Sequence, residues 1–236
     1  MWRQALGRVD DRMVCSHFIG ELLQKFYGRD YHVIYPPVEV ADFPLGQGPA
    51  DERPTILSVA DFTVPRKGVR VLVEAFRLVK QAVPKAILRL SGNMPEWLQA
   101  EVLRDVPEAV RRDIEILGLG KPGDVPELYR QASVMALPAM WEPSGGAMLE
   151  AFASGTPVVA TRHGGLPEFM TPEVGVLFDP LTTDQETRNV QGLADALVEG
   201  LDLAQRPGIR ERCRAHVQQY STESIGPVLE KFYAGA

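Results

Sequence analysis

The chain has 236 residues, of which 45% are hydrophobic and 24% charged, and a formal net charge of −6. These values are typical of a soluble globular protein with one large domain, or with one domain and a fragment of another, and the acidic balance argues against nucleic-acid binding, which needs a basic face. Two cysteines are too few for a disulfide framework or a zinc site and fit a reducing cytoplasm, and no apolar stretch approaches the roughly eighteen residues of a membrane span.

The first 35 residues are expected to fold as a unit distinct from the rest. Residues 12–15 and 31–35 are strand candidates, and between them Ser16 can cap a helix over residues 17–27 that carries an apolar stripe. The stretch at residues 36–54 is rich in Pro, Gly and Asp and is expected to be a linker.

From residue 55 to residue 236, strands and helices alternate in one predicted domain. Short apolar runs predict strands at residues 55–59, 86–90, 114–117, 134–137, 157–160 and 175–178. Helices are predicted at residues 69–82, in one or two short pieces between 95 and 112, and at residues 125–131, 145–154, 190–203, 207–219 and 224–233, with a short turn near Pro167. This alternation predicts an α/β fold with a doubly wound parallel sheet, which binds ligands at the carboxyl ends of its strands.

The most specific segment runs from residue 142 to residue 160. An apolar strand leads into a Ser-Gly-Gly turn at residues 144–146, and the turn opens a helix, an arrangement that offers main-chain N–H groups and the helix dipole to an anion. Glu142 lies on the loop and Glu150 inside the helix, roughly 7 Å along its axis at about 1.5 Å per residue. That step matches the one from a nucleotide's phosphates to its ribose, whose diol suits a carboxylate. The alternative is an ordinary β-α-β unit whose two glutamates are solvated.

The pattern Glu-x7-Glu, followed by Gly-Thr-Pro-Val-Val-Ala at residues 155–160, resembles the C-terminal domain of group 1 glycosyltransferases. These are retaining enzymes of the GT-B fold that use nucleotide-sugar donors. Further motifs follow in family order: Arg-Lys-Gly-Val at 66–69, Asp-Val-Pro-Glu-Leu-Tyr at 124–129, Gly-Gly-Leu-Pro-Glu at 164–168 and Gly-Val-Leu-Phe-Asp-Pro at 175–180. The resemblance implies a Rossmann-like C-terminal half, here residues 55–236.

The first unit also resembles part of that family. Ser-His-Phe at residues 16–18 and Tyr-Pro-Pro-Val at 35–38 match the helix and strand that close the family's N-terminal domain. Residues 1–35 are therefore expected to be the remnant of an N-terminal, acceptor-side domain, with roughly one domain of 100–200 residues missing in front.

The resemblance implies a role for each residue of the glycine turn and its flanks. Glu142 is expected to contact the transferred sugar and to support positive charge at the anomeric carbon, and Glu150 to bind the ribose diol. The donor's phosphates are expected to meet the main-chain N–H groups of the turn, and the sugar a second glycine pair; these donor-binding residues are Ser144, Gly145, Gly146, Ala147, Gly164 and Gly165.

Two cations precede a predicted helix, where positive charge is mildly unfavourable unless an anion binds between them. The resemblance implies that Lys67 is catalytic and binds the pyrophosphate, with Arg66 beside it; otherwise both are solvated loop residues. The chain departs from the pattern of the family that it resembles at Phe62, where the family usually carries an arginine. The missing guanidinium removes a bidentate phosphate clamp, for which Arg66 is one substitute.

The implied function is transfer of a sugar from a nucleotide-sugar donor to a sugar or lipid-linked acceptor, with retention of anomeric configuration. No cofactor and no metal is expected, because Asp-x-Asp, the metal-binding signature of the other glycosyltransferase architecture, is absent. The expected location is the cytoplasm, with peripheral contact at the inner face of a membrane left open.

Other functions remain open for a chain that lacks most of an acceptor domain. It is expected to be weakly active or inactive alone, so one alternative is a non-catalytic nucleotide-sugar-binding fragment or half of a split enzyme. A second alternative is a nucleotide-sugar epimerase of the GT-B type.

Overall fold

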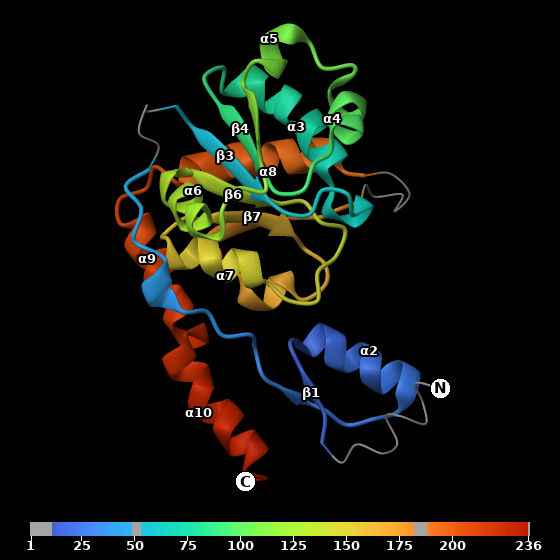
Figure 1. The fold of residues 1–236 in the computed structure, drawn as a ribbon, viewed down its shortest axis with the longest axis vertical. Coiled ribbons are helices and arrows are strands. Elements are labelled where there is room, and N and C mark those ends of the chain that lie inside the picture. Colours follow the sequence, from blue (N-terminus) through green and yellow to red (C-terminus); the bar gives the residue numbers. More distant parts are fainter. Residues whose placement is uncertain (1–10, 49–52, 182–187, 236) are drawn as a thin grey trace.

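The computed structural model describes residues 11–48, 53–181 and 188–235, and its centre is a six-stranded parallel sheet (Figure 1). The strand order is β5-β4-β3-β6-β7-β8, and neighbouring strands run in the same direction throughout. The strands are β3 (Thr55–Val59), β4 (Ile87–Ser91), β5 (Ile114–Gly118), β6 (Val134–Leu137), β7 (Val158–Thr161) and β8 (Gly175–Phe178).

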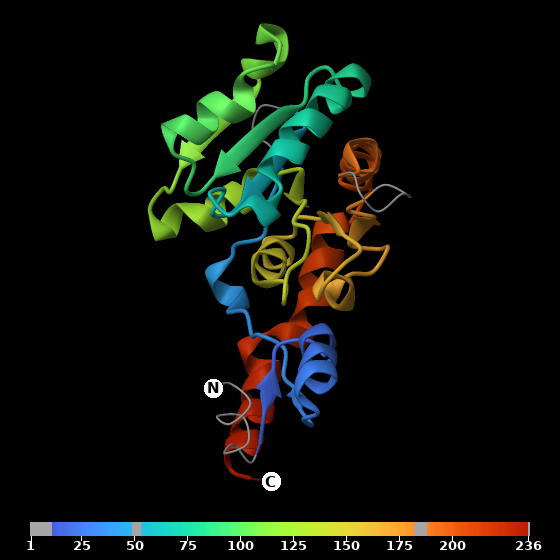
Figure 2. The same ribbon diagram turned by 90° about the vertical axis from the view of Figure 1, so that its right-hand side faces the viewer.

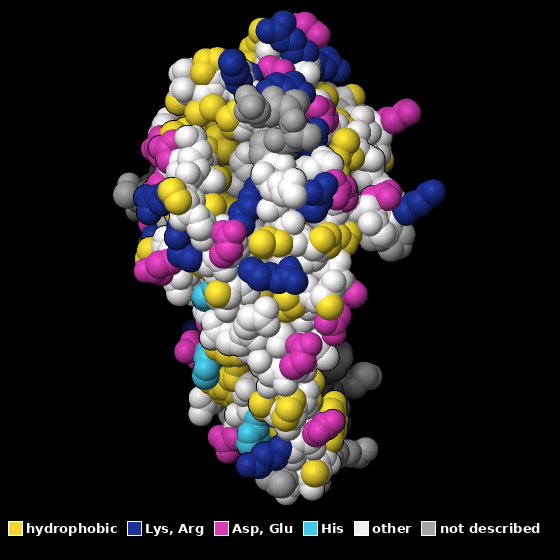
Figure 3. All heavy atoms as spheres, turned by 90° about the vertical axis from the view of Figure 1, so that its left-hand side faces the viewer, with side chains coloured by type: hydrophobic (Ala, Val, Ile, Leu, Met, Phe, Trp, Pro, Cys, Tyr) yellow, Lys and Arg dark blue, Asp and Glu magenta, His cyan; other side chains and the backbone are white. Residues whose placement is uncertain are grey.

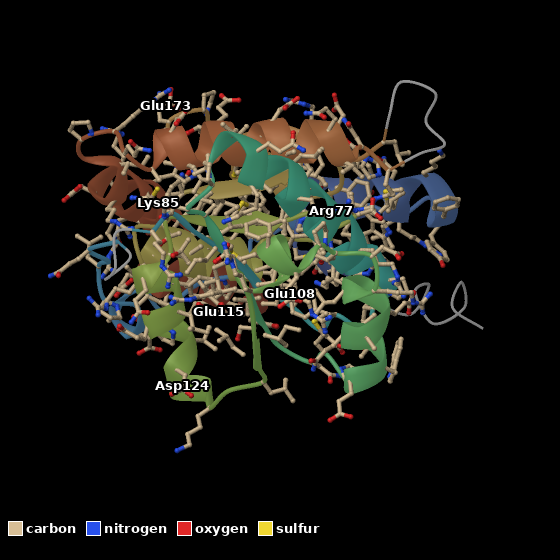
Figure 4. The ribbon with its side chains drawn as sticks, turned by 90° about the horizontal axis from the view of Figure 1, so that it is seen from above. Arg77, Lys85, Glu108, Glu115, Asp124 and Glu173 are labelled. Atoms are coloured by element: carbon tan, nitrogen blue, oxygen red, sulfur yellow. The ribbon has the colours of Figure 1, made fainter. Side chains whose placement is uncertain are left out.

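Helices cover both faces of this sheet, because alternate strand residues point to opposite sides. Ile56 packs in a core with α3 (Val69–Ala82), α4 (Glu96–Leu103) and α8 (Val190–Leu203). Its neighbour Leu57 packs in a second core with α6 (Val125–Gln131), α7 (Gly146–Ala153) and α9 (Ile209–Val217). From above, α3 and α8 lie together over the sheet (Figure 4). The predicted doubly wound α/β fold is confirmed.

Most predicted boundaries hold, and the deviations have local causes. The strands predicted at 55–59, 134–137 and 175–178 have those bounds. Those predicted at 86–90 and 157–160 are shifted by one residue, and the one predicted at 114–117 is one residue longer. The strand predicted from Pro157 starts at Val158, because proline lacks an N–H for the ladder; its carbonyl accepts from Met135 N at 2.9 Å. The short helices between 95 and 112 are α4 and α5 (Glu108–Arg111), and the turn near Pro167 is η4 (Leu166–Phe169).

Residues 11–35 form a strand-helix-strand unit below the sheet (Figure 1). The two strands, β1 (Met13–Val14) and β2 (His32–Val33), pair in parallel and are shorter than predicted. Between them α2 (His17–Tyr27) has its predicted bounds, and the predicted cap is confirmed, because the Ser16 side chain accepts from Ile19 N at 3.3 Å.

The last helix, α10 (Thr222–Tyr233), leaves the sheet and runs beside this unit (Figure 2). Its Phe232 ring lies 5.4 Å from the ring of His32, centroid to centroid. The predicted helix at 207–219 is divided into α9 and the 3-10 turn η5 (Gln218–Tyr220), and α10 starts two residues earlier than predicted because Ser221 caps it.

The predicted linker packs along the sheet domain where the structure describes it. It contains the short 3-10 turn η1 (Val40–Asp42), and Val38 and Val40 are buried in the second core. Val38 N donates to Tyr220 O at 2.9 Å, and Thr222 N donates to Val38 O at 3.1 Å. The segment that leaves the first unit and the segment that leads into α10 are therefore hydrogen-bonded side by side.

The surface carries charges of both signs. On the face shown in Figure 3, lysine and arginine side chains are interspersed with aspartate and glutamate side chains, in keeping with the net charge of −6. No helix in the described ranges is long and apolar enough to cross a lipid bilayer.

Candidate functional site

The predicted site residues meet where the strand order reverses. In chain order β4 and β5 are added on one side of β3, whereas β6, β7 and β8 are added on the other, so the crevice between the carboxyl ends of β3 and β6 is the switch point at which such sheets bind ligands. The turn η2 (Pro65–Lys67) follows β3, and the loop to α7 follows β6. Met140 N donates to Arg66 O at 2.7 Å, which holds the two connections together.

Glu142 lies against both predicted cations. Its Oε1 is 2.6 Å from Lys67 Nζ and 2.9 Å from Arg66 Nη1, and its side chain is only 10% exposed. Arg66 also donates to Trp141 O at 3.0 Å, and its guanidinium lies 4.9 Å from the centroid of the Trp141 ring. Partly buried, charge-assisted pairs of this kind hold side chains in a defined geometry. A bound diphosphate and the Glu142 carboxylate would therefore compete for the same two cations.

The glycine turn delivers free N–H groups to the same place. Gly145 precedes α7 without a side-chain cap hydrogen bond, and the first helical bond runs from Leu149 N to Gly145 O at 2.8 Å. The N–H groups of Gly146, Ala147 and Met148 have no carbonyl one turn before them, as at the start of any helix. Nothing lies within 4 Å of a Cβ added at Gly146, so the space in front of this residue is open. Ser144 lies in the turn just before these groups.

Glu150 projects from α7 and is held by a buried tyrosine. Its Oε2 accepts from the Tyr129 hydroxyl at 2.9 Å. Burial raises the pKa of Glu150, and the hydrogen bond from Tyr129 opposes that shift. Burial, followed by the charge of Glu150, raises the pKa of Tyr129 well above its usual value. The hydroxyl therefore stays a donor, and Oε1 of Glu150 remains for another partner. The sequence marked Tyr129 only as part of a family motif.

Gly164 and Gly165 lie against the main chain of Glu142 and Pro143. Gly165 N donates to Glu142 O at 2.8 Å. A Cβ at Gly164, whose φ is +76°, would come 2.5 Å from Glu142 O, and a Cβ at Gly165 would come 2.3 Å from Pro143 O. The glycine pair therefore has a packing role, the support of Glu142. Contact with the donor sugar remains a prediction.

Phe62 points away from the site. Its side chain is 2% exposed in the core with α3, and Phe62 N donates to Asn93 O at 3.0 Å. Asp61 shapes this loop by accepting from Thr63 N at 3.1 Å and from the Thr63 hydroxyl at 2.6 Å. An arginine at residue 62 would need another loop conformation to reach the crevice.

A second guanidinium, that of Arg188, contacts the main chain of the loop after β6. The sequence did not single out this residue. Arg188 Nη2 donates to Pro138 O at 2.7 Å and would lie 2.9 Å from a Cβ at Gly68. The Nε atom of Arg188 is buried without a hydrogen-bond partner, and burial lowers the pKa of the Arg188 guanidinium. Arg188 follows β8 by ten residues, where no motif was apparent.

Within residues 11–48, 53–181 and 188–235, no group of three or more His, Cys, Asp or Glu side chains is arranged to hold a metal ion.

The sequence and the fold of the chain are similar to those of known glycosyltransferases. The family model described as "Glycosyl transferases group 1" matches residues 53–202. The chain is 29% identical over 245 residues to D-inositol 3-phosphate glycosyltransferase of Segniliparus rotundus, covering 96% of this chain and 52% of that protein. It is 32% identical over 148 residues to the uncharacterized glycosyltransferase MJ1607 of Methanocaldococcus jannaschii, covering 62% of this chain and 37% of that protein.

Solved structures show the same fold. Sucrose-phosphate synthase from Thermosynechococcus elongatus superposes with a TM-score of 0.79 at 23% identity, over 100% of this chain and 61% of that one. Anabaena Alr3699/HepE in complex with UDP-glucose superposes with a TM-score of 0.76 at 20% identity, over 97% of this chain and 65% of that one. The chain thus spans about half the length of the S. rotundus relative and less of the M. jannaschii protein.

Proposed function

This chain belongs to the group 1 glycosyltransferases, and from that premise we propose that it is the donor-binding half of an enzyme that transfers a sugar from a nucleoside diphosphate sugar to an acceptor. The observation that carries the proposal is the meeting of Glu142, Lys67 and the uncapped start of α7 at the switch point of the sheet. Two fold neighbours support a donor of this class: Anabaena Alr3699/HepE is in complex with UDP-glucose, and the pneumococcal O-GlcNAc transferase GtfA is in complex with UDP and GlcNAc.

Each residue then has a chemical role. The diphosphate binds the N–H groups at the start of α7 and the Lys67 ammonium, with Arg66 beside it. The Glu150 carboxylate accepts from the ribose diol through Oε1, because Oε2 is held by Tyr129. Glu142 then lies toward the sugar, where it accepts from hydroxyl groups and stabilises positive charge at the anomeric carbon.

Transfer in this scheme proceeds with retention and without a metal. As the bond between the sugar and the diphosphate breaks, negative charge grows on the departing phosphate, and Lys67 and the helix amides stabilise it electrostatically. A covalent sugar–enzyme intermediate is not required. The acceptor is a sugar or a lipid-linked molecule, and it enters from the side that an N-terminal domain would cover.

A second candidate is a donor-binding module without activity of its own. The chain covers only 52% of the S. rotundus relative, although 96% of the chain is matched. Positioning of an acceptor, which needs the other half of such an enzyme, can by itself lower a barrier by about 7–11 kcal/mol. We therefore expect little transfer by this chain alone. Turnover of nucleotide sugars by the isolated chain, measured as release of nucleoside diphosphate, would exclude this second candidate.

Calorimetry on two variants tests the donor site. We expect one of UDP, GDP or ADP to bind, and Lys67→Ala to weaken that nucleotide and inorganic pyrophosphate alike, by about ten- to a hundredfold, the worth of a charge-assisted contact. Glu150→Ala should weaken the nucleotide to a similar extent and leave pyrophosphate almost unchanged, because only the nucleotide has a ribose.

Lys85→Ala is the matched control. Lys85 is exposed and lies just before β4, at the amino edge of the sheet (labelled in Figure 4), so its loss changes the net charge equally without touching the crevice. Equal affinities in all three variants and the parent chain would refute the assigned site.

A further inference from the structure

The start of α2 is fastened to the sheet domain by one carboxylate. The main-chain N–H groups of His17 and Phe18 donate to Glu168 at 2.8 and 2.9 Å, one to each carboxylate oxygen. Tyr35, at the end of the same unit, donates its hydroxyl to Glu168 Oε2 at 3.1 Å. Burial, followed by the charge of Glu168, raises the pKa of Tyr35 to about 12, so this hydroxyl remains a donor at every physiological pH.

The same helix end holds the loop that carries Glu142. Ser16, which is fully buried, donates its hydroxyl to Pro143 O at 2.5 Å while it caps α2. Two residues further on, the Phe18 ring lies 6.3 Å from the ring of Trp141 and 5.8 Å from that of His163, centroid to centroid. The residues on both sides of Glu142 are therefore in contact with α2.

Glu168 closes this arrangement into a ring of contacts. It lies three residues after Gly165, whose N–H donates to Glu142 O at 2.8 Å. From Glu168 the contacts run to the start of α2, from Ser16 to Pro143, and from Glu142 back through Gly165. The loop before α7 is thus clamped between α2 on one side and residues 163–168 on the other.

We propose that Glu168 is a positioning residue for Glu142: it holds the start of α2 in the place from which Ser16 and Phe18 fix the loop. The proposal rests on the proposed function for its consequence, because Glu142 is the group assigned to the donor's sugar. Lys67, Glu150 and Tyr129 lie outside the ring of contacts. Loss of Glu168 should therefore damage recognition of the sugar more than recognition of the nucleotide.

Glu168→Gln is the variant that tests this role. A glutamine keeps the size but presents an NH₂ donor to one of two N–H donors, so one hydrogen bond and the negative charge at the helix start are lost. Ser16→Ala removes the next link and serves if the first variant folds poorly. Glu199→Gln, which removes an exposed carboxylate on α8, is the matched control.

Two measurements are needed, and the first uses no ligand. Hydrogen exchange of the Gly165 amide, which donates to Glu142 O, should be faster by about tenfold in Glu168→Gln and Ser16→Ala, and unchanged in Glu199→Gln, since each removed contact stabilises the closed loop. Unchanged exchange in both variants would overturn the proposal, whatever the protein binds.

The second measurement compares affinities for UDP, GDP and ADP with those for their glucose conjugates. The ratio of the two affinities for one base isolates the sugar contact. We expect that ratio to fall by about three- to tenfold in Glu168→Gln and Ser16→Ala, with the nucleotide alone changed by less than about twofold. An unchanged ratio, or a loss confined to the nucleotide, would show Glu168 to be merely structural. If no nucleotide binds even the parent chain, the proposed function fails, and hydrogen exchange still decides whether Glu168 holds the loop.

Discussion

Replacement of Glu142 by glutamine should tighten the binding of inorganic pyrophosphate. Lys67 Nζ and Arg66 Nη1 both lie within 3 Å of Glu142 Oε1. A phosphate that binds Lys67 therefore has its charge within roughly 6 Å of the carboxylate, and glutamine removes both the repulsion and the competition for the cations.

The magnitude follows from Coulomb's law. Two unit charges 6 Å apart repel by about 0.7 kcal/mol in water and by about 2.8 kcal/mol at an effective dielectric constant of 20. The carboxylate is 10% exposed, which favours the upper part of that range. Pyrophosphate affinity should therefore rise by about threefold at least and by about a hundredfold at most, and the gain should shrink as salt is added.

Titration calorimetry at low and at high salt measures this effect. Glu115→Gln is the matched control, because Glu115 is also paired, with Arg89 at 2.7 Å, but lies on the edge strand β5 (labelled in Figure 4). Weaker pyrophosphate binding by Glu142→Gln would refute the reasoning, since it would mean that the carboxylate organises the cations instead of competing for them. In an enzyme that combines this donor-binding half with an acceptor domain, the same variant should lose turnover more than nucleotide affinity.

Two further predictions concern stability and chemistry. Burial raises the pKa of Glu150 above its ordinary value of 4.5, so protonation of this carboxyl favours the folded state at low pH, and that stabilisation is lost as the pH rises through the folded-state pKa. Glu150→Gln can still accept from Tyr129 and should therefore melt at a higher temperature than the parent chain at pH 7, and no higher below pH 4.5. A lower melting temperature of the variant at pH 7 would contradict this. The intact parent enzyme should transfer sugar in the presence of a chelator, and NMR of the product should show the donor's anomeric configuration; strict dependence on added metal, or inversion, would disprove that part of the mechanism.

The sequence predicted the sheet well because its central strands are buried on both faces. Runs such as Val134–Leu137 are apolar at every position, and the helices between them carry amphipathic stripes, so length and periodicity suffice. It also placed Lys67 and Glu142 at the same edge of the sheet, because both follow strands of one parallel sheet. Their direct contact, across 75 positions of the chain, depends on the loop conformations that Gly164 and Gly165 impose, and no local pattern contains that information.

Other features depended on tertiary context for the same reason. Phenylalanine at residue 62 was interpreted only as the loss of a guanidinium that would bind phosphate. In the structure, the loop shaped by Asp61 directs the Phe62 side chain into the core. Glu168 was recognised only as part of a motif, and its partners at the start of α2 are 150 and 151 positions away. Helix periodicity predicted α10 but could not show that it leaves the sheet domain.

Two chain segments, rather than one, join the first unit and α10 to the six-stranded sheet, and they are paired at Val38 and Ser221. A single extended segment would allow rotation about any axis. Two segments that are hydrogen-bonded to each other cannot turn independently, so any motion between the two bodies must carry both segments along or break their pairing. The pairing therefore restricts how α2 can approach or leave the loop at Glu142.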